Sequence, residues 1–175
     1  MAKAYSGIGS RQTPKGILRE MTDLAIFLDE NGYILRSGGA YGADSAFEEG
    51  ATRKEIYLAA KGDRGHSSHL FGVCEKALEI GEKYHPNWSN LSRRGKLLMA
   101  RNSYQVLGER LDDPVDFVIC YTPNGEGGGG TGQAIRIAED FGIPIFDLGK
   151  TEITGESIKN FVRWKNLISW TDTKT

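Results

Sequence analysis

Apolar residues along the chain alternate between short, β-branched runs and longer stretches with helical spacing. The short runs predict strands, and the longer stretches predict amphipathic helices between them. The predicted strands are 4–8, 33–36, 55–59, 115–120 and 143–146, and the predicted helices are 14–30, 43–51, 70–83, 91–110, 131–140 and 156–164. This order predicts an α/β, three-layer Rossmann-like fold, with a mainly parallel, doubly wound sheet and helices on both faces.

The chain has 175 residues, which suits one domain, and it contains no internal repeat. We expect residues 1–150 to form the Rossmann-like domain itself. Residues 151–175 are expected to form a C-terminal helix and tail packed on that domain, with 171–175 as a frayed end.

Glycine is unusually frequent, at 23 of the 175 residues against a usual share of ~7 %. Three groups of glycines each follow a predicted strand and precede a predicted helix. These groups are Gly7 and Gly9; Gly38, Gly39 and Gly42; and Gly127 to Gly130 with Gly132. Because such turns lie at the carboxyl edge of a parallel sheet, we expect them to converge on one crevice. Bare backbone and helix amino termini bind anions there, so the pattern predicts a phosphate site.

Each glycine group taken alone is also typical of a tight turn that needs a positive φ. Gly7-x-Gly9 lacks the third glycine of the dinucleotide fingerprint, and no G-x-x-x-x-G-K-[ST] sequence occurs. The chain therefore predicts neither a standard NAD site nor a P-loop ATPase, and we expect no cofactor. Three groups at equivalent positions favour the phosphate site, because turns alone would also use asparagine and aspartate.

Several short motifs, taken in order, resemble the core of the DNA-processing protein A (DprA/Smf) family. They are Gly9-Ser10-Arg11, Ser37-Gly38-Gly39-Ala40-x-Gly42-x-Asp44, Arg101-Asn102, and Gly130-Thr131-Gly132-x-Ala134 with Gly142-Ile143-Pro144-Ile145 beyond it. The resemblance spans roughly residues 4–148 and extends to the wider Rossmann-like group that includes the LOG-type phosphoribohydrolases. We expect no flanking domains, and in this the chain resembles the compact, stand-alone versions that phages and mobile elements encode.

The resemblance implies a protein that holds a nucleotide, a nucleotide-derived signal or single-stranded DNA through phosphate contacts. A recombinase and a second copy of the chain, in a homodimer, are the partners that it implies. The predicted ligand-binding residues are Gly9, Ser10, Arg11, Ser37, Gly38, Gly39, Ala40, Asp44, Arg101, Asn102, Gly129, Gly130 and Thr131.

Basic residues gather within the predicted helix 91–110, although the chain as a whole is balanced at 22 basic against 23 acidic residues. Arg93, Arg94 and Lys96 form a patch that can track a nucleic-acid backbone, and Trp88 and Tyr104 are placed to stack on bases. A solvated helix face explains the three basic residues equally well. The balanced net charge limits any nucleic-acid surface to such a local patch.

The alternative function is an enzyme that releases free base from nucleoside 5'-monophosphates, an N-glycosidase or phosphoribohydrolase. Asp44 and Glu126 are its candidate catalytic carboxylates, because cleavage of an N-glycosidic bond needs an acid near the reacting atoms. Asp44 suits a helix cap as well. The LOG-type loop carries a catalytic glutamate shortly after its threonine, whereas Gly132, Gln133 and Ala134 follow Thr131 here. This difference favours binding without turnover.

Metal and membrane chemistry find little support in the sequence. His66, His69 and Cys74 are close in sequence but lack a fourth ligand, so we expect no metal site. Cys74 and Cys120 are too few for a disulfide framework, and Cys120 is expected in the core. The first residues lack the pattern of a secretory leader, and no apolar run of ~18 residues occurs. We therefore expect a cytoplasmic protein without a membrane partner.

Overall fold

The computed structural model describes residues 3–172, with side chains through residue 169, and it contains a five-stranded sheet. The strands are β1 (Ala4–Gly7), β2 (Ile34–Ser37), β3 (Lys54–Ile56), β4 (Phe117–Cys120) and β5 (Ile145–Asp147). They are ordered β3-β2-β1-β4-β5, and all four neighbouring pairs are parallel. The predicted Rossmann-like fold is confirmed, because the chain winds outward from β1 in both directions.

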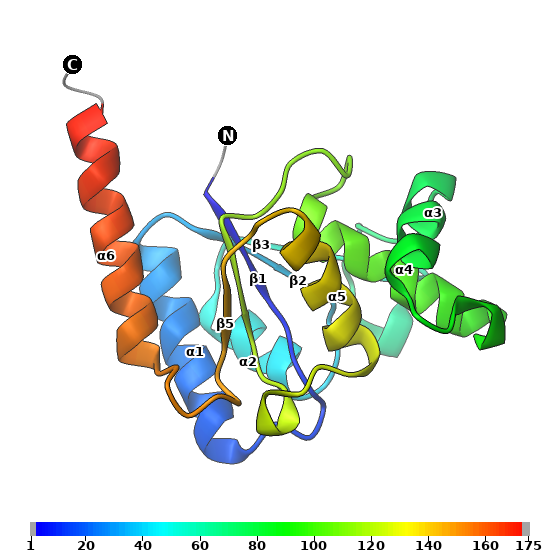
Figure 1. Cartoon of the computed structure of the whole chain (residues 1–175), viewed down its shortest axis with the longest axis horizontal. Helices are drawn as coiled ribbons and strands as arrows, with labels where there is room; N and C mark the ends of the chain where they lie inside the picture. Colours follow the sequence, from blue (N-terminus) through cyan, green and yellow to red (C-terminus); the bar gives the residue numbers. More distant parts are fainter. Residues whose placement is uncertain (1–2, 173–175) are drawn as a thin grey trace.

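Two layers of helices cover the sheet (Figure 1). The helices are α1 (Lys15–Glu30), α2 (Ala43–Gly50), α3 (Glu75–Tyr84), α4 (Arg93–Leu107), α5 (Gly129–Asp140) and α6 (Gly155–Asp172). Side chains of α1, α2 and α6 pack into one buried cluster, and those of α3, α4 and α5 pack into another. The three-layer arrangement follows, with one apolar cluster on each face of the sheet.

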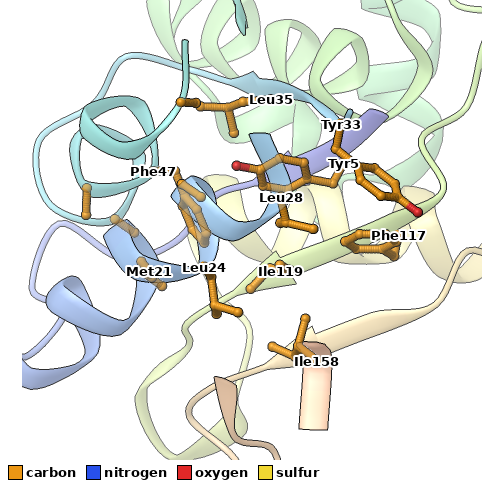
Figure 2. Close-up of a cluster of buried hydrophobic side chains, with 14 of the residues drawn as sticks. Tyr5, Met21, Leu24, Leu28, Tyr33, Leu35, Phe47, Phe117, Ile119 and Ile158 are labelled. Atoms are coloured by element: carbon orange, nitrogen blue, oxygen red, sulfur yellow. The ribbon is translucent and has the colours of Figure 1, made fainter. Parts of the chain in front are cut away.

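The pleat of the strands divides their side chains between the two faces. Tyr5 and Phe117 join the cluster beneath α1, where Figure 2 shows them beside Leu28 and Ile119. Their rings stack with centroids 6.0 Å apart. Val118, the neighbour of Phe117, belongs to the opposite cluster. Both faces of β4 are thus fully covered, as a continuous apolar run in a parallel sheet requires.

Some element boundaries differ from the sequence prediction. The predicted start of α3 at residue 70 is five residues too early, because residues 70–72 pair with Leu58 in an isolated parallel bridge. The Leu58 N–H donates to the Leu70 carbonyl at 2.9 Å, and the Gly72 N–H donates to the Leu58 carbonyl at 3.0 Å. These long-range bonds use backbone groups that a helix would have paired locally.

Helix α1 begins one residue later than the prediction, which placed Pro14 inside it and Thr13 at its cap. Pro14 has an extended ψ of 147°, and the Thr13 hydroxyl donates instead to the Ser10 carbonyl at 2.6 Å. That bond stabilises the turn after β1 rather than the helix end.

The C-terminal helix α6 packs on the same domain and runs past the predicted end at residue 164 to Asp172. Ile158 and Val162 are fully buried in the cluster that contains α1, and the Gly155 N–H donates to the Glu20 carboxylate at 2.6 Å. Of the expected frayed tail, residues 173–175 lie outside the described residues. Over the described residues, α6 included, no helix combines the length and apolar character needed to cross a bilayer.

A buried carboxylate fixes the turn that follows β4. Asp147, at the end of β5 and 3 % exposed, accepts from the Thr122 N–H and from the Gly149 N–H, each at 2.9 Å. The Thr122 hydroxyl donates to its other oxygen. The end of β5 thereby fixes the first residues beyond β4, at the edge of the sheet where the glycine-rich turns lie.

We expect Asp147→Ala to lower the free energy of unfolding by about 2–4 kcal/mol, because it leaves the buried N–H and hydroxyl of Thr122 and the partly buried N–H of Gly149 without an acceptor. Urea denaturation measures the change. Asp147→Asn keeps an acceptor oxygen for the N–H groups and should lose clearly less. Equal losses in the two variants would contradict this account.

Candidate functional site

A cleft of about 490 Å³ opens at the carboxyl edge of the sheet, where residues beyond β1 and β4 face each other. Its lining comes from the turns after β1, β2 and β4, from helix α4 and from the segment after β3. Eleven of the predicted site residues line it: Gly9, Ser10, Arg11, Ala40, Asp44, Arg101, Asn102, Glu126, Gly129, Gly130 and Thr131. The topology explains the convergence, because this is the point where the strand order reverses.

Arg101 is the buried cation of the cleft and comes from the middle of α4. Its side chain is 6 % exposed, and its Nη1 donates to the Gly38 carbonyl at 2.7 Å and to the Tyr57 carbonyl at 3.1 Å. Its buried Nε has no hydrogen-bond partner among the described residues. Burial lowers the pKa of Arg101 and the charge of Asp44 opposes this shift, but an arginine stays protonated in a protein.

Ser37, Gly38 and Gly39, three of the predicted ligand-binding residues, lie behind the cleft and not in its lining. The Ser37 hydroxyl donates to the Gly7 carbonyl at 2.6 Å and joins two neighbouring strands. A Cβ on Gly38 would lie 1.7 Å from Nη1 of Arg101, and Gly39 has a φ of +64°. In this part of the chain the glycines make room for Arg101 and for the turn itself.

Asp44 is a buried acid in the wall of the cleft. It lies in the first turn of α2 and is 5 % exposed, and its Oδ2 accepts from the Ala40 N–H at 3.2 Å. Burial raises the pKa of Asp44, while the nearby charge of Arg101 and the N–H groups of Ala40 and Gly38 oppose the rise. No ion pair within 4.0 Å joins Asp44 to Arg101 in the described part of the chain. Both charges therefore face the same cleft separately.

The turns after β1 and β2 pack against each other through bare backbone. A Cβ on Gly9 would lie 2.7 Å from that of Ala43 and 3.1 Å from the Tyr121 nitrogen. Gly42 has a φ of +85° and lies against the backbone of Arg11. Arg11 itself is exposed, and its guanidinium has no hydrogen bond or ion pair with another described residue. The packing of the two turns fixes the position of the Arg11 backbone, while its guanidinium stays accessible to a ligand.

The glycine run between β4 and α5 serves more than one purpose. Gly130 faces the Asn102 amide, which donates to its carbonyl at 3.2 Å, and Gly132 packs on the Gly127 carbonyl. Gly129 has a φ of +54°. Gly128 differs from these, because its φ of −125° and ψ of 172° suit any residue and no atom lies within 4 Å of an added Cβ. None of the described residues therefore requires glycine at position 128.

The predicted nucleic-acid patch is largely engaged within the protein. Arg94 pairs with Asp63 at 2.8 Å, and the Lys96 ammonium lies 5.6 Å from the centre of the Trp88 ring. Arg93 is exposed. Tyr104 is 7 % exposed and stacks on Tyr57 with centroids 5.6 Å apart, so its proposed stacking on bases is wrong.

Other residues line the cleft without having been predicted as ligand-binding, and they include Arg64, Gln105, Tyr121 and Thr122. Gln105 lies one helical turn beyond Arg101, so the spacing of four residues contained a signal for it. Arg64 follows β3, whose carboxyl end lies at the same edge as the three glycine-rich turns. The sequence alone gives no signal for Arg64, because its place at the site follows from the strand order.

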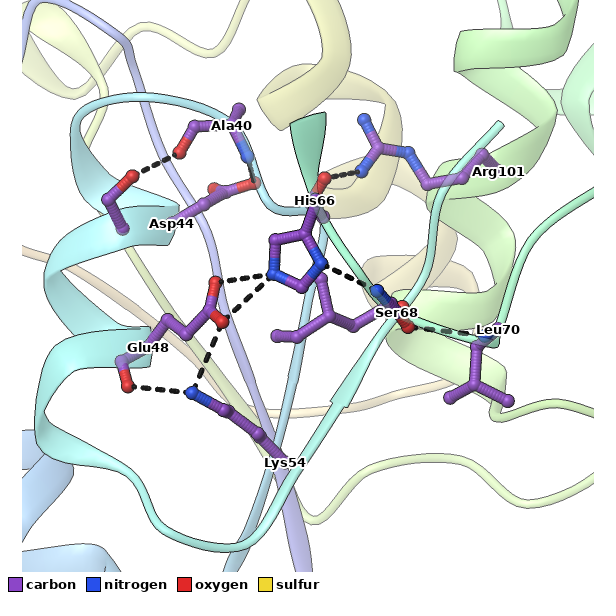
Figure 3. A network of polar contacts seen from close by, with 11 residues as sticks. Ala40, Asp44, Glu48, Lys54, His66, Ser68, Leu70 and Arg101 are labelled. Atoms are coloured by element: carbon purple, nitrogen blue, oxygen red, sulfur yellow. Dashed lines mark hydrogen bonds and ion pairs between the residues drawn. The ribbon is translucent and has the colours of Figure 1, made fainter. Parts of the chain in front are cut away.

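The histidine and cysteine considered as metal ligands or core residues, His66 and Cys120, have other contacts in the structure. His66 pairs with Glu48 at 2.9 Å through Nε2, and its Nδ1 accepts from the Ser68 N–H at 3.0 Å (Figure 3). Within the described residues, no group of three or more His, Cys, Asp and Glu side chains is arranged to hold a metal ion. Cys120 is fully buried, and burial raises the pKa of its thiol, which is the behaviour of a core residue.

Comparison with known proteins places the fold. No family model and no curated protein matches the chain. Among solved structures, DNA processing protein A from Helicobacter pylori matches with a TM-score of 0.62 at 18 % identity, over 96 % of this chain and 81 % of that chain. That structure concerns a unique single-stranded DNA binding mode. The Moco carrier protein of Chlamydomonas rheinhardtii matches with a TM-score of 0.49 at 17 % identity, over 93 % of this chain and 84 % of that one.

The sheet order and the cleft define a class of α/β protein, one with a Rossmann-like fold and a glycine-rich cleft at the point where the strand order reverses. Within that class, the chain has a fold like that of DNA processing protein A. The resemblance expected from the short motifs is confirmed at the level of the fold. The links to LOG-type enzymes and to phage-encoded versions stay predictions.

We expect Gly38→Ala to lower the free energy of unfolding by about 1–3 kcal/mol, because the added methyl group displaces the Arg101 guanidinium. In an Arg101→Ala background the same substitution should have a smaller effect, since the nearest obstructing group is gone and Gln105 Nε2, 2.4 Å from the added Cβ, remains. Urea denaturation of the four proteins completes the cycle. An equal loss in both backgrounds would show that Arg101 is not what requires glycine at this position.

Proposed function

We propose that the protein binds the phosphate group of a nucleotide, a nucleotide-derived signal or single-stranded DNA in this cleft. The observation that carries the proposal is the convergence of turns from three strands with Arg11 and Arg101 on one cleft. The lining carries three arginines against two carboxylates, Asp44 and Glu126, which leaves one net positive charge. An anion balances that charge and gains hydrogen bonds from the guanidinium groups.

The start of α5 adds a second source of attraction for an anion. Gly128 is its N-cap and supplies no side-chain cap, and no acidic residue occurs in its first turn. The first N–H groups of a helix have no partner within the helix and carry a partial positive charge. Because Gly128 to Thr131 line the cleft, these donors are available to a phosphate there.

Gly128 supports a close approach of the ligand. Its backbone geometry and its open surroundings would accept a side chain, and the residue itself lines the cleft. Glycine also costs stability through the entropy of the unfolded chain. A phosphate that lies directly against the backbone accounts for its presence.

The volume of the cleft, about 490 Å³, lies within the ~300–1,000 Å³ typical of small-molecule sites. A nucleotide therefore fits the cleft itself, whereas a DNA strand would have to continue beyond it. Since Arg94 and Lys96 are engaged within the protein, DNA binding draws its support from the cleft arginines and from the fold. The recombinase and the homodimer stay predictions.

We expect Gly128→Ala to weaken ligand binding without loss of stability, because its Cβ occupies the space that the phosphate would take. The melting temperature should stay the same or rise slightly. Alanine reduces the conformational entropy of the unfolded chain, which raises the free energy of unfolding by ~0.4–1 kcal/mol. Calorimetric titration with the nucleoside 5'-monophosphates, inorganic phosphate and a short oligo(dT) measures the affinity. Gly16→Ala in α1, also at a site with no atom within 4 Å, is the matched control and should bind normally.

Arg11→Ala is the companion variant, since Arg11 has no partner whose loss would affect folding. For oligo(dT), the slope of log affinity against log salt should be ~−0.7 for each phosphate contacted, which separates a DNA strand from a single nucleotide. Wild-type binding that persists unchanged in both Gly128→Ala and Arg11→Ala would place the ligand elsewhere. Failure of the wild-type protein to bind any probe would overturn the proposed function.

Asp44 supports a second candidate function, hydrolysis of the N-glycosidic bond of a nucleoside monophosphate. It is a buried carboxyl in the wall of the cleft, and burial raises its pKa, as is common for catalytic acids. Glu126 is exposed at the same cleft and is the other carboxyl that can act. Binding alone remains the better-supported proposal, because no acid takes the place of the LOG-type glutamate.

The second candidate predicts that free base is released from at least one nucleoside 5'-monophosphate. Release should be lost in Asp44→Asn while calorimetric binding is kept, because the amide cannot transfer the proton. Chromatography of the reaction mixture detects the base, and Glu126→Gln serves as the parallel test of the other carboxyl. If no base appears from any of the monophosphates, hydrolysis is excluded and binding stands alone.

A further inference from the structure

The segment between β3 and α3 carries a backbone conformation that its sequence does not favour. Arg64 has a φ of 55° and a ψ of 25°, in the left-handed region, between Gly62 and Gly65, which also have positive φ. A residue other than glycine pays roughly 1–2 kcal/mol for this conformation. Leu111 and Asn124 are the other non-glycine cases among the described residues. Such strain persists where the surrounding structure enforces it.

An ion pair and a histidine–carboxylate hydrogen bond hold this segment in place, one on each side of Arg64. Asp63 accepts from the Ala60 N–H at 3.0 Å and pairs with Arg94 of α4 at 2.8 Å. His66 pairs with Glu48 of α2 at 2.9 Å, and Lys54 pairs with the same carboxylate at 3.1 Å. Figure 3 shows His66 pointing toward Glu48 from the side of Ser68. The segment is therefore anchored to both α4 and α2, the helices that supply Arg101 and Asp44.

Arg64 lies between these anchors and lines the cleft, yet its guanidinium makes no hydrogen bond or ion pair with a described residue. Its charge reaches the two buried groups of the site, since it adds to the lowering of the pKa of Arg101 and opposes the rise that burial causes in the pKa of Asp44. Two arginine charges that face one cleft repel each other, and an anion between them relieves the repulsion. Asp63 and His66, on either side of Arg64, both have side-chain partners, whereas the Arg64 guanidinium has none among the described residues.

We propose that Arg64 is a ligand-binding residue of the cleft and that the Asp63–Arg94 ion pair and the His66–Glu48 hydrogen bond hold it in position to contact an anionic group of the ligand. This inference rests on the proposed function, because it assumes that a phosphate-bearing ligand enters the cleft. The chemistry that it adds is a third guanidinium, supplied from the segment after β3. Asp63 acts through Arg64 and is a positioning residue.

The test uses the full chain with the same nucleoside 5'-monophosphates, inorganic phosphate and oligo(dT). Arg64→Gly removes the charge and also relieves the left-handed strain, so its melting temperature should stay the same or rise. Its affinity should fall about ten- to hundredfold, the range expected for one charge-assisted hydrogen bond. Arg64→Lys should recover part of the affinity. Arg110→Ala removes a strongly exposed arginine outside the cleft lining and should bind like the wild type.

A double-mutant cycle tests the positioning role of Asp63. Asp63→Asn keeps an acceptor for the Ala60 N–H but removes the charge that pairs with Arg94, and it should weaken binding less than Arg64→Gly does. In the Arg64→Gly background, Asp63→Asn should have no further effect, because the group that it positions is absent. A further loss there would overturn the positioning role.

The outcomes separate this inference from the function on which it rests. Normal affinity of Arg64→Gly, together with weakened binding in Gly128→Ala and Arg11→Ala, would overturn the role of Arg64 and leave the phosphate site intact. An absence of wild-type binding to all probes would overturn both. A loss of affinity in Arg64→Gly with an unchanged melting temperature supports the inference, because lost folding cannot explain it.

Discussion

The contact between the Arg101 guanidinium and the bare backbone of Gly38 is the interaction on which the site depends. It joins the middle of α4 to the end of β2, and the same guanidinium also reaches the carbonyl beyond β3. A charge buried this deeply is tolerated only when polar groups receive it. The two carbonyls do so in part, while the unpartnered Nε and the nearby Asp44 leave the cleft with charged groups that are not fully paired within the protein. The floor of the cleft is therefore polar because of how α4 packs.

The glycines of this chain serve three separate physical purposes, which a count of glycines does not distinguish. Gly9 and Gly38 are bare because neighbouring atoms fill the space of a Cβ. Gly42 provides a positive φ in a turn that packs on the backbone of Arg11. Gly128 meets neither need, and its open surroundings border the cleft. Only this third case points directly to a ligand, whereas the first two build the walls that such a ligand would meet.

Periodicity predicted the elements well because burial on each face of the sheet imposes a regular pattern on the chain. Tyr5 and Phe117 are examples, since each is fully buried where the strand pattern requires it. Predictions failed where long-range contacts replaced local ones. Residues 70–72 pair with Leu58 instead of starting α3, and Tyr104 stacks on Tyr57 instead of facing solvent.

The sequence by itself determined the fold class, the order of the elements and the turns that meet at one sheet edge, because these depend on local periodicity and on the topology of parallel sheets. Only the tertiary structure decided which residues of those turns face the cleft. Ser37, Gly38 and Gly39 lie behind it, while Arg64 enters it from a segment without any motif. The physical reason is that the direction of a side chain in a turn depends on packing between distant elements, here the burial of Arg101 and the Asp63–Arg94 and His66–Glu48 contacts that anchor the segment of Arg64.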